Sequence, residues 1–402
     1  PSNVKNINDT DIKILGSGID SLVMAVDVRW ENESLFEYLG ELKENAKENN
    51  KEFPGSLGPD ENMKWYFNMY PSGAKGWEWI LKGQEFTLII GNWLEPISRP
   101  SVLVDIGSET LWRVGPRDSV DWILELIRCV GGGIISVKPS RVDLCVDILM
   151  HESLWTEDLK NFRVTRARKL HPYYENERLT GMMIGKGAIS ARIYDKEYEI
   201  RTQSKKFWMF DIWGIEEIPE DMRIIRIEFQ LRRQVIKDLG IDTIKDLYSL
   251  LDFLWAYCTK KWLKFQDRPG KHHTQRETFK WWKIIQKGFL GVQDAIPLIR
   301  AKAISIDSEK LRNQALGFFT SLMASEAEKK NLNIDEDIDY REILIALIKS
   351  TEWVGKDNYD FNEEVKRKRI KYHRTIKKLN QIIEERIGLG FPIGNISVER
   401  ND

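Results

Sequence analysis

The chain has 402 residues, enough for two domains, and its content of 42% hydrophobic and 31% charged residues is that of a globular protein. Its 61 basic and 62 acidic residues give a net charge of −1, so any nucleic-acid surface must be a local patch rather than bulk charge. Three scattered cysteines and the lack of a long apolar run exclude a disulfide framework and a membrane span, and are typical of a cytoplasmic protein.

The first half of the chain predicts strands with interspersed helices. Apolar and polar residues alternate in 19–30, as in a half-buried strand, and helical spacing follows in 34–50. The next expected elements are a Pro- and Gly-rich loop at 54–60, short strands at 76–91 and 101–106, and an amphipathic helix at 117–130. Asp118 or Ser119 is the expected N-cap of that helix.

Three later segments alternate with period two and are predicted strands: 141–148, 189–196 and 222–231. One face of each is apolar. The other face carries a row of charged or polar side chains, namely Arg141, Asp143, Cys145 and Asp147; then Arg192, Tyr194 and Lys196; then Arg226, Glu228 and Gln230.

After about residue 240 the strand signals fade. Helices are predicted at 243–265, 274–290, 308–328, 340–350 and 361–387. We therefore expect an α+β protein with a mainly antiparallel sheet domain at 11–240 and a helical domain at 241–395, divided near Gly240.

The first and third of these strands share a pattern, Arg141-Val142-Asp143 and Arg226-Ile227-Glu228. If the strands are neighbours, Asp143 and Glu228 lie about 5 Å apart, which is unfavourable unless a cation or an arginine stands between them. A divalent cation is the functional interpretation, and cross-strand Arg–carboxylate pairing is the structural one.

Asp147 needs a separate interpretation. It lies about 13 Å along the strand from Asp143, so the two do not easily bind one metal ion. One of them is then a ligand, and the other supports it, faces DNA or forms a structural ion pair.

These segments resemble the replication initiation factor family, which includes rolling-circle plasmid initiators and relaxases of conjugative elements. The resemblance rests on five ordered motifs over about two-thirds of the chain: GSGIDSLVMAVDV (16–28), RVDLCVDI (141–148), MIGKGAISARIYDK (183–196), RIEFQLRR (226–233) and RETFKWWKIIQ (276–286).

The resemblance implies DNA strand nicking and joining. In that chemistry a tyrosine attacks the scissile phosphate beside Mg²⁺ or Mn²⁺ and becomes linked to the 5′ phosphate. By the same resemblance, Asp143 and Glu228 are metal ligands, Asp147 is a less certain one, and Arg192 and Lys196 are basic groups beside the phosphate.

The sequence departs from the family pattern at the nucleophile, because Met183 stands where the family has its tyrosine. Three explanations stay open: another tyrosine acts, the site binds DNA without nicking it, or the chain carries an inactivating substitution. Tyr173 and Tyr174 are preferred over Tyr194, for which a structural role is expected.

Two basic segments are candidate DNA contacts. Residues 260–287 interleave basic and aromatic side chains, which suits phosphate contact and base stacking or, equally, an amphipathic helix pair with a tryptophan core. Residues 366–378 hold eight Lys or Arg and no acid. The basic residues selected are Lys260, Lys261, Lys264, Arg268, Lys271, Arg276, Lys280, Lys366, Arg367, Lys368 and Arg369.

Three hypotheses follow for the function. The leading one is a rolling-circle initiator or relaxase that nicks and joins origin or transfer-site DNA in the cytoplasm. The second is a nicking-deficient DNA-binding protein of the same fold, and the third is an unrelated α+β protein whose sheet charges are ion pairs. The resemblance also makes a homodimer and a helicase partner plausible, and no membrane partner is expected.

Overall fold

The computed structural model describes residues 12–60, 63–267 and 276–290, with a few isolated positions beyond them. The chain divides into two compact units, Pro1–Arg300 and Ala301–Asp402. The predicted boundary near Gly240 lies inside the first unit. The helices predicted at 308–328, 340–350 and 361–387 fall almost entirely outside the described residues, so the helical C-terminal domain stays a prediction.

The first unit is built on a sheet of eleven strands. They are β1 (Ile12–Trp30), β2 (Phe53–Leu57), β3 (Trp65–Met69), β4 (Trp79–Gly83), β5 (Phe86–Ile90), β6 (Val102–Ile106), β7 (Gly132–His151), β9 (Leu170–Glu175), β10 (Arg178–Gly185), β11 (Ile189–Asp195) and β12 (Met222–Arg232). A two-stranded sheet pairs β8 (Arg163–Thr165) with β13 (Leu263–Phe265).

Ten α-helices are described. They are α1 (Ser34–Glu48), α2 (Ser108–Arg113), α3 (Pro116–Cys129), α4 (Leu159–Phe162), α5 (Lys196–Glu199), α6 (Trp208–Trp213), α7 (Arg233–Asp238), α8 (Ile244–Ser249), α9 (Leu251–Ala256) and α10 (Lys280–Lys287). Among the described residues, none of these helices has the length and apolar character to cross a membrane.

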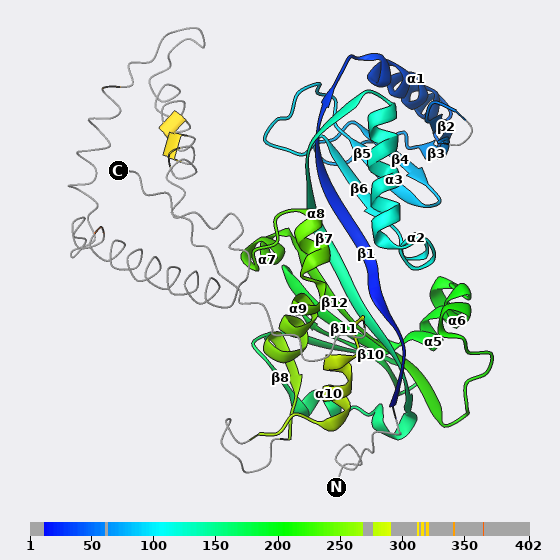
Figure 1. Ribbon diagram of the computed structural model, residues 1–402, viewed down its shortest axis with the longest axis vertical. Helices are drawn as coiled ribbons and strands as arrows, with labels where there is room; N and C mark the ends of the chain where they lie inside the picture. Colours follow the sequence, from blue (N-terminus) through cyan, green and yellow to red (C-terminus); the bar gives the residue numbers. More distant parts are fainter. Residues whose placement is uncertain are drawn as a thin grey trace, which may run out of the picture. The chain divides into compact units, whose positions relative to one another are not determined.

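The large sheet has the strand order β2-β3-β4-β5-β6-β1-β7-β12-β11-β10-β9, and its neighbouring strands pair antiparallel. The long strands β1 and β7 run side by side (Figure 1). In the sheet they lie between strands β2 to β6 on one side and strands β9 to β12 on the other. The predicted α+β class with a mainly antiparallel sheet is therefore confirmed.

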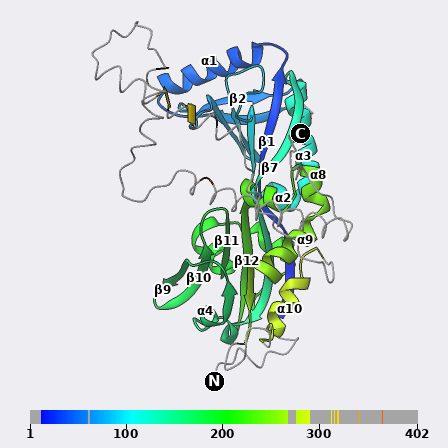
Figure 2. The same ribbon diagram turned by 90° about the vertical axis from the view of Figure 1, so that its left-hand side faces the viewer.

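The alternation of the three informative strands is confirmed. Val142, Leu144 and Val146 of β7 are fully buried on one face. Helices α8 to α10 lie along this face (Figure 2), and the ring of Phe229 in β12 contacts that of Trp255 at 5.4 Å between centroids. The opposite face of the same strands carries the charged row.

Glycines let the helices approach the sheet closely. A Cβ at Gly132, the first residue of β7, would lie 2.6 Å from Cγ2 of Ile127 in α3. A Cβ at Gly55 would lie 2.6 Å from Cδ1 of Leu42 in α1. Gly55 belongs to β2, so the predicted loop at 54–60 is wrong in its first half.

A further local prediction is wrong. The N-cap of α3 is Gly115, not Asp118 or Ser119, because Pro116 starts the helix and proline suits that first position. The segment predicted as one helix at 243–265 is helical over most of its length, but it is divided into α8, α9 and a π-helical turn, and it ends in strand β13. Turn and cap geometry sets where these helices begin and end, and the spacing of apolar residues does not predict that geometry.

The aromatic residues of the segment 260–287 belong largely to the core. Phe265, Phe279, Trp281 and Trp282 are each at most 8% exposed. They are not available to stack on bases, so the core interpretation of these four rings holds. The basic residues between them remain candidates for phosphate contact.

Candidate functional site

Strand register gathers the charged residues on one face of the sheet. Arg192 of β11 pairs with Glu228 of β12, which pairs with Cys145 of β7. Two residues before Glu228 in β12, Arg226 pairs with Asp147 of β7. Strands β7 and β12 are neighbours, which was the condition for a close carboxylate pair, but Glu228 faces Cys145, so Glu228 and Asp143 are diagonal rather than opposite.

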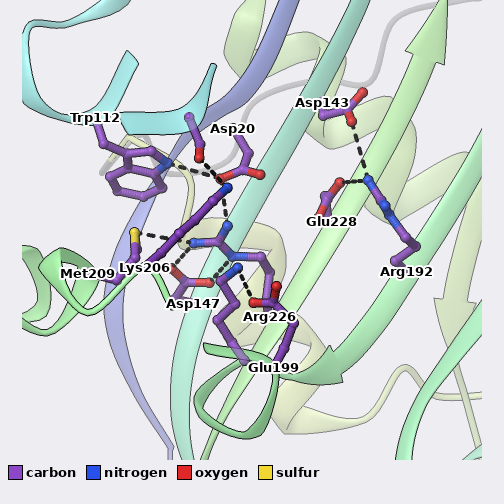
Figure 3. Close-up of polar contacts among 12 residues, drawn as sticks. Asp20, Trp112, Asp143, Asp147, Arg192, Glu199, Lys206, Met209, Arg226 and Glu228 are labelled. Carbon is purple, nitrogen blue, oxygen red and sulfur yellow. Dashed lines mark hydrogen bonds and ion pairs between the residues drawn. The ribbon is translucent and has the colours of Figure 1, made fainter. Parts of the chain in front are cut away.

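Arg192 lies between two buried carboxylates (Figure 3). Its guanidinium forms a short ion pair with Glu228 and lies 3.3 Å from Asp143 Oδ2. Arg141 donates to both Asp143 oxygens, the longer contact being 2.9 Å. The carboxylates are only 1–2% exposed, whereas Arg192 is 44% exposed. We call Asp143, Arg192 and Glu228 the Arg192 cluster.

Burial controls the ionisation of this cluster. It raises the pKa of Glu228 above its ordinary value, although Arg192 opposes the rise. The Tyr194 hydroxyl donates to Glu228 Oε2 at 3.1 Å. Burial and the nearby Glu228 charge raise the pKa of Tyr194 well above its ordinary value. Tyr194 is therefore held as a neutral hydrogen-bond donor, in keeping with the structural role expected for it.

Asp147 lies in a second, more deeply buried cluster. Arg226 donates to both its oxygens, at 2.6 and 2.7 Å, and Trp213 Nε1 donates at 2.9 Å. Arg226 also donates to Asp20 Oδ1 at 2.6 Å, where Trp112 Nε1 donates at 3.2 Å. We call Asp20, Asp147 and Arg226 the Arg226 cluster (Figure 3). Its contacts give Asp147 the structural ion pair that was one of its predicted alternatives.

Asp20 is the site residue that sequence reasoning missed. Burial would raise its pKa, but Arg226, Lys196, Lys206 and Trp112 together outweigh burial and lower the pKa to about 2. The signal was present in the GSGID motif at 16–20. A bulge of β1 between Ile19 and Ser21 places Asp20 there, and the sequence pattern does not show such a bulge.

Lys196 is buried rather than exposed to a phosphate. It begins α5, is 2% exposed and forms an ion pair of 2.6 Å with Glu199. Burial and Arg226 lower its pKa below the ordinary value. Of the two basic groups predicted beside the phosphate, only Arg192 therefore presents a substantially exposed charge.

The predicted tyrosines separate onto two faces. The register of β9, β10 and β11 aligns Tyr173 with Gly181 and Tyr194, on the face of the charged clusters. The Tyr173 hydroxyl lies 3.6 Å from the sulfur of Met183, and Met183 pairs with Arg192. Tyr173 is 50% exposed. Tyr174, the next residue, points to the opposite face, where it interacts with Glu157.

The donor set of the Arg192 cluster fits a magnesium-type cation only in part. Two carboxylates suffice when substrate phosphates and water complete the coordination. Within residues 12–60, 63–267 and 276–290, no group of three or more His, Cys, Asp or Glu side chains is placed to hold a metal ion. The position between Asp143 and Glu228 is occupied by Arg192, so a cation would have to displace that guanidinium.

The predicted DNA contacts are described in part. Lys261 and Lys280 are exposed, and Lys260, Lys264 and Arg276 are half-buried. The other predicted contacts lie outside the described residues: Arg268, Lys271, Lys366, Arg367, Lys368 and Arg369.

Comparison of the chain with known protein families and with curated proteins finds no match.

Proposed function

We propose that the protein nicks and rejoins one strand of DNA, as a rolling-circle replication initiator or relaxase does. The observation that carries the proposal is the Arg192 cluster with Tyr173 nearby. Two buried carboxylates beside a half-exposed arginine offer charges for a cation and a phosphate. Tyr173 presents a half-exposed hydroxyl on the same face of the sheet. Structural ion pairs alone do not require such a tyrosine.

Tyr173 is the proposed nucleophile. Its oxygen attacks phosphorus, the P–O3′ bond breaks, and a phosphotyrosyl link to the 5′ phosphate forms. The proton lost by the phenol balances the proton gained by the 3′ oxygen, and the reverse reaction reseals the strand. Tyr194 is less suited because Glu228 and burial hold its proton, and Tyr174 points to the other face.

Asp143 and Glu228 would hold the divalent cation, Mg²⁺ or Mn²⁺. That ion would supply positive charge beside the scissile phosphate. With an ion held there, Arg192 would be displaced from between the carboxylates, and its guanidinium would be free to bind a phosphate oxygen. Asp147 in the Arg226 cluster and Lys196 beside that cluster are buried and would not contact DNA.

The alternative is a nicking-deficient DNA-binding protein of the same fold. The specific observation in its favour is Met183, which stands at the tyrosine position of the resembled family. The proposal places the protein in the cytoplasm with origin or transfer-site DNA as partner. A homodimer and a helicase partner are candidates drawn from the resemblance.

The test is nicking of a supercoiled plasmid that carries the DNA flanking the gene. We expect nicked circles with Mn²⁺ and none with EDTA. Glu228→Gln should abolish nicking and leave DNA affinity within about twofold, measured by gel shift. Tight binding without nicking under all conditions would favour the alternative, and neither binding nor nicking would exclude both.

A further inference from the structure

A cavity of about 500 Å³ lies beside a free edge of β1. Strand β6 pairs with β1 only over Leu22–Val26, so in the part of the chain that the structure describes, β1 before that point pairs with β7 alone. The cavity adjoins residues 17–19, between the start of α3 and the helices α8 and α9. Its volume is within the usual range of small-ligand sites.

The wall of this cavity includes three aromatic residues, and Arg117 and Asp118 supply its charged groups. Trp112, Tyr248 and Phe289 line it, and Arg117 stacks over the Tyr248 ring at 4.8 Å from the centroid. The Tyr248 hydroxyl donates to the carbonyl of Pro116 at 2.8 Å, which fixes the ring. A stacked guanidinium keeps its in-plane donors available, and that geometry suits a phosphate.

The strand register relates the cavity to the proposed nicking site. Gly18 at its edge pairs with Cys145, and Cys145 pairs with Glu228. Two inter-strand steps separate Gly18 from Glu228, about 10 Å. Trp112 lines the cavity and also contacts the Arg226 cluster, because its indole donates to Asp20.

We propose that this cavity binds one nucleotide of a single DNA strand, with the base against the aromatic wall and its phosphate on Arg117. The ligand class rests on the proposed function, which supplies DNA. Stacking accepts any base, so the cavity would hold the strand without reading its sequence. It would fix the position of the strand relative to the nicking site.

The test is titration of the whole protein with dTMP, thymidine and inorganic phosphate, followed by saturation-transfer NMR. EDTA is present throughout, so the result does not depend on a cation at Asp143 and Glu228. We expect dTMP to bind more than fivefold tighter than either fragment. Arg117→Gln should weaken dTMP at least fivefold.

Arg113→Gln is the matched control, because Arg113 is an exposed arginine of α2 paired with Glu109 outside the cavity. It should leave dTMP affinity unchanged. Equal affinities for dTMP and phosphate, equal losses in the two arginine variants, or no dTMP binding at millimolar concentration would each overturn the proposal. Nicking is measured separately, so a failure of either proposal is seen on its own.

Discussion

At the scale of single residues, the ion pairs of Arg192 bear most directly on the proposed site. It neutralises Asp143 and Glu228, which are nearly inaccessible to solvent, while much of its own surface stays exposed. Removing one partner of a buried charge group leaves the others without compensation. Without Arg192, Asp143 keeps Arg141, but Glu228 loses its ion-pair partner and would be neutralised by another cation or by a proton.

This gives a prediction for Arg192→Gln. The variant should bind Mn²⁺ at least tenfold tighter than the wild type, measured by calorimetry, because the ion no longer competes with the guanidinium. Arg141→Gln is the control, since it removes the same charge beside Asp143 but leaves Arg192 between the carboxylates. An equal gain in both variants would mean that overall charge, and not displacement, sets the affinity.

Asp20 predicts a pH effect on stability. Its pKa falls from 3.8 to about 2 in the folded protein, so its contribution is complete above about pH 4 and is lost as pH falls toward 2. The shift corresponds to about 2 kcal/mol.

Asp20→Asn should therefore lower the free energy of unfolding by about 2 kcal/mol at pH 7 and flatten its pH dependence between 4 and 2, measured by urea denaturation. The exposed-site variant Asp121→Asn should follow the wild-type curve. If the free energy of unfolding of Asp20→Asn depended on pH as the wild type does, other carboxylates would cause the acid sensitivity.

At the scale of elements, the packing of α3 on β7 depends on Gly132. A Cβ there would meet both Cγ2 and the carbonyl oxygen of Ile127, at 2.6 and 2.7 Å. Gly132→Ala should cost about 1–3 kcal/mol by overpacking, measured by thermal and urea unfolding.

Gly40 is the matched position. It lies in α1, and a methyl group added there would have no other atom within 4 Å, so Gly40→Ala should stabilise the protein by about 0.5–1 kcal/mol through helix propensity. If Gly132→Ala were also neutral or stabilising, α3 would have to lie farther from β7 than it does here.

Strand patterns were the most predictable elements. Period-two alternation identified β7, β11 and β12 and the shared face of Arg192, Arg226 and Glu228, because a strand has only two faces. It placed Lys196 at the end of a strand, whereas Lys196 begins α5. It did not give the register. Glu228 faces Cys145 rather than Asp143, and a register is set by bulges and by distant pairing that a single strand does not encode.

At the scale of the whole molecule, one face of β7, β11 and β12 packs in the core and the other carries clusters of ion pairs. Arg226 and Arg192 each join carboxylates that lie far apart in the sequence, with Asp20 and Arg226 separated by 206 positions. Composition and spacing predicted that charges gather on this face. They did not predict that two separate clusters form, since that depends on which strands become neighbours.

The central claim is that Tyr173 is the nucleophile beside the Arg192 cluster. The most direct measurement is detection of a protein–DNA adduct that survives SDS, on the plasmid carrying the flanking DNA, with peptide mapping of the linked residue. We predict an Mn²⁺-dependent adduct at Tyr173 that is lost in Tyr173→Phe and kept in Tyr174→Phe. An adduct that persists in Tyr173→Phe, or tight DNA binding without any adduct, would contradict the claim.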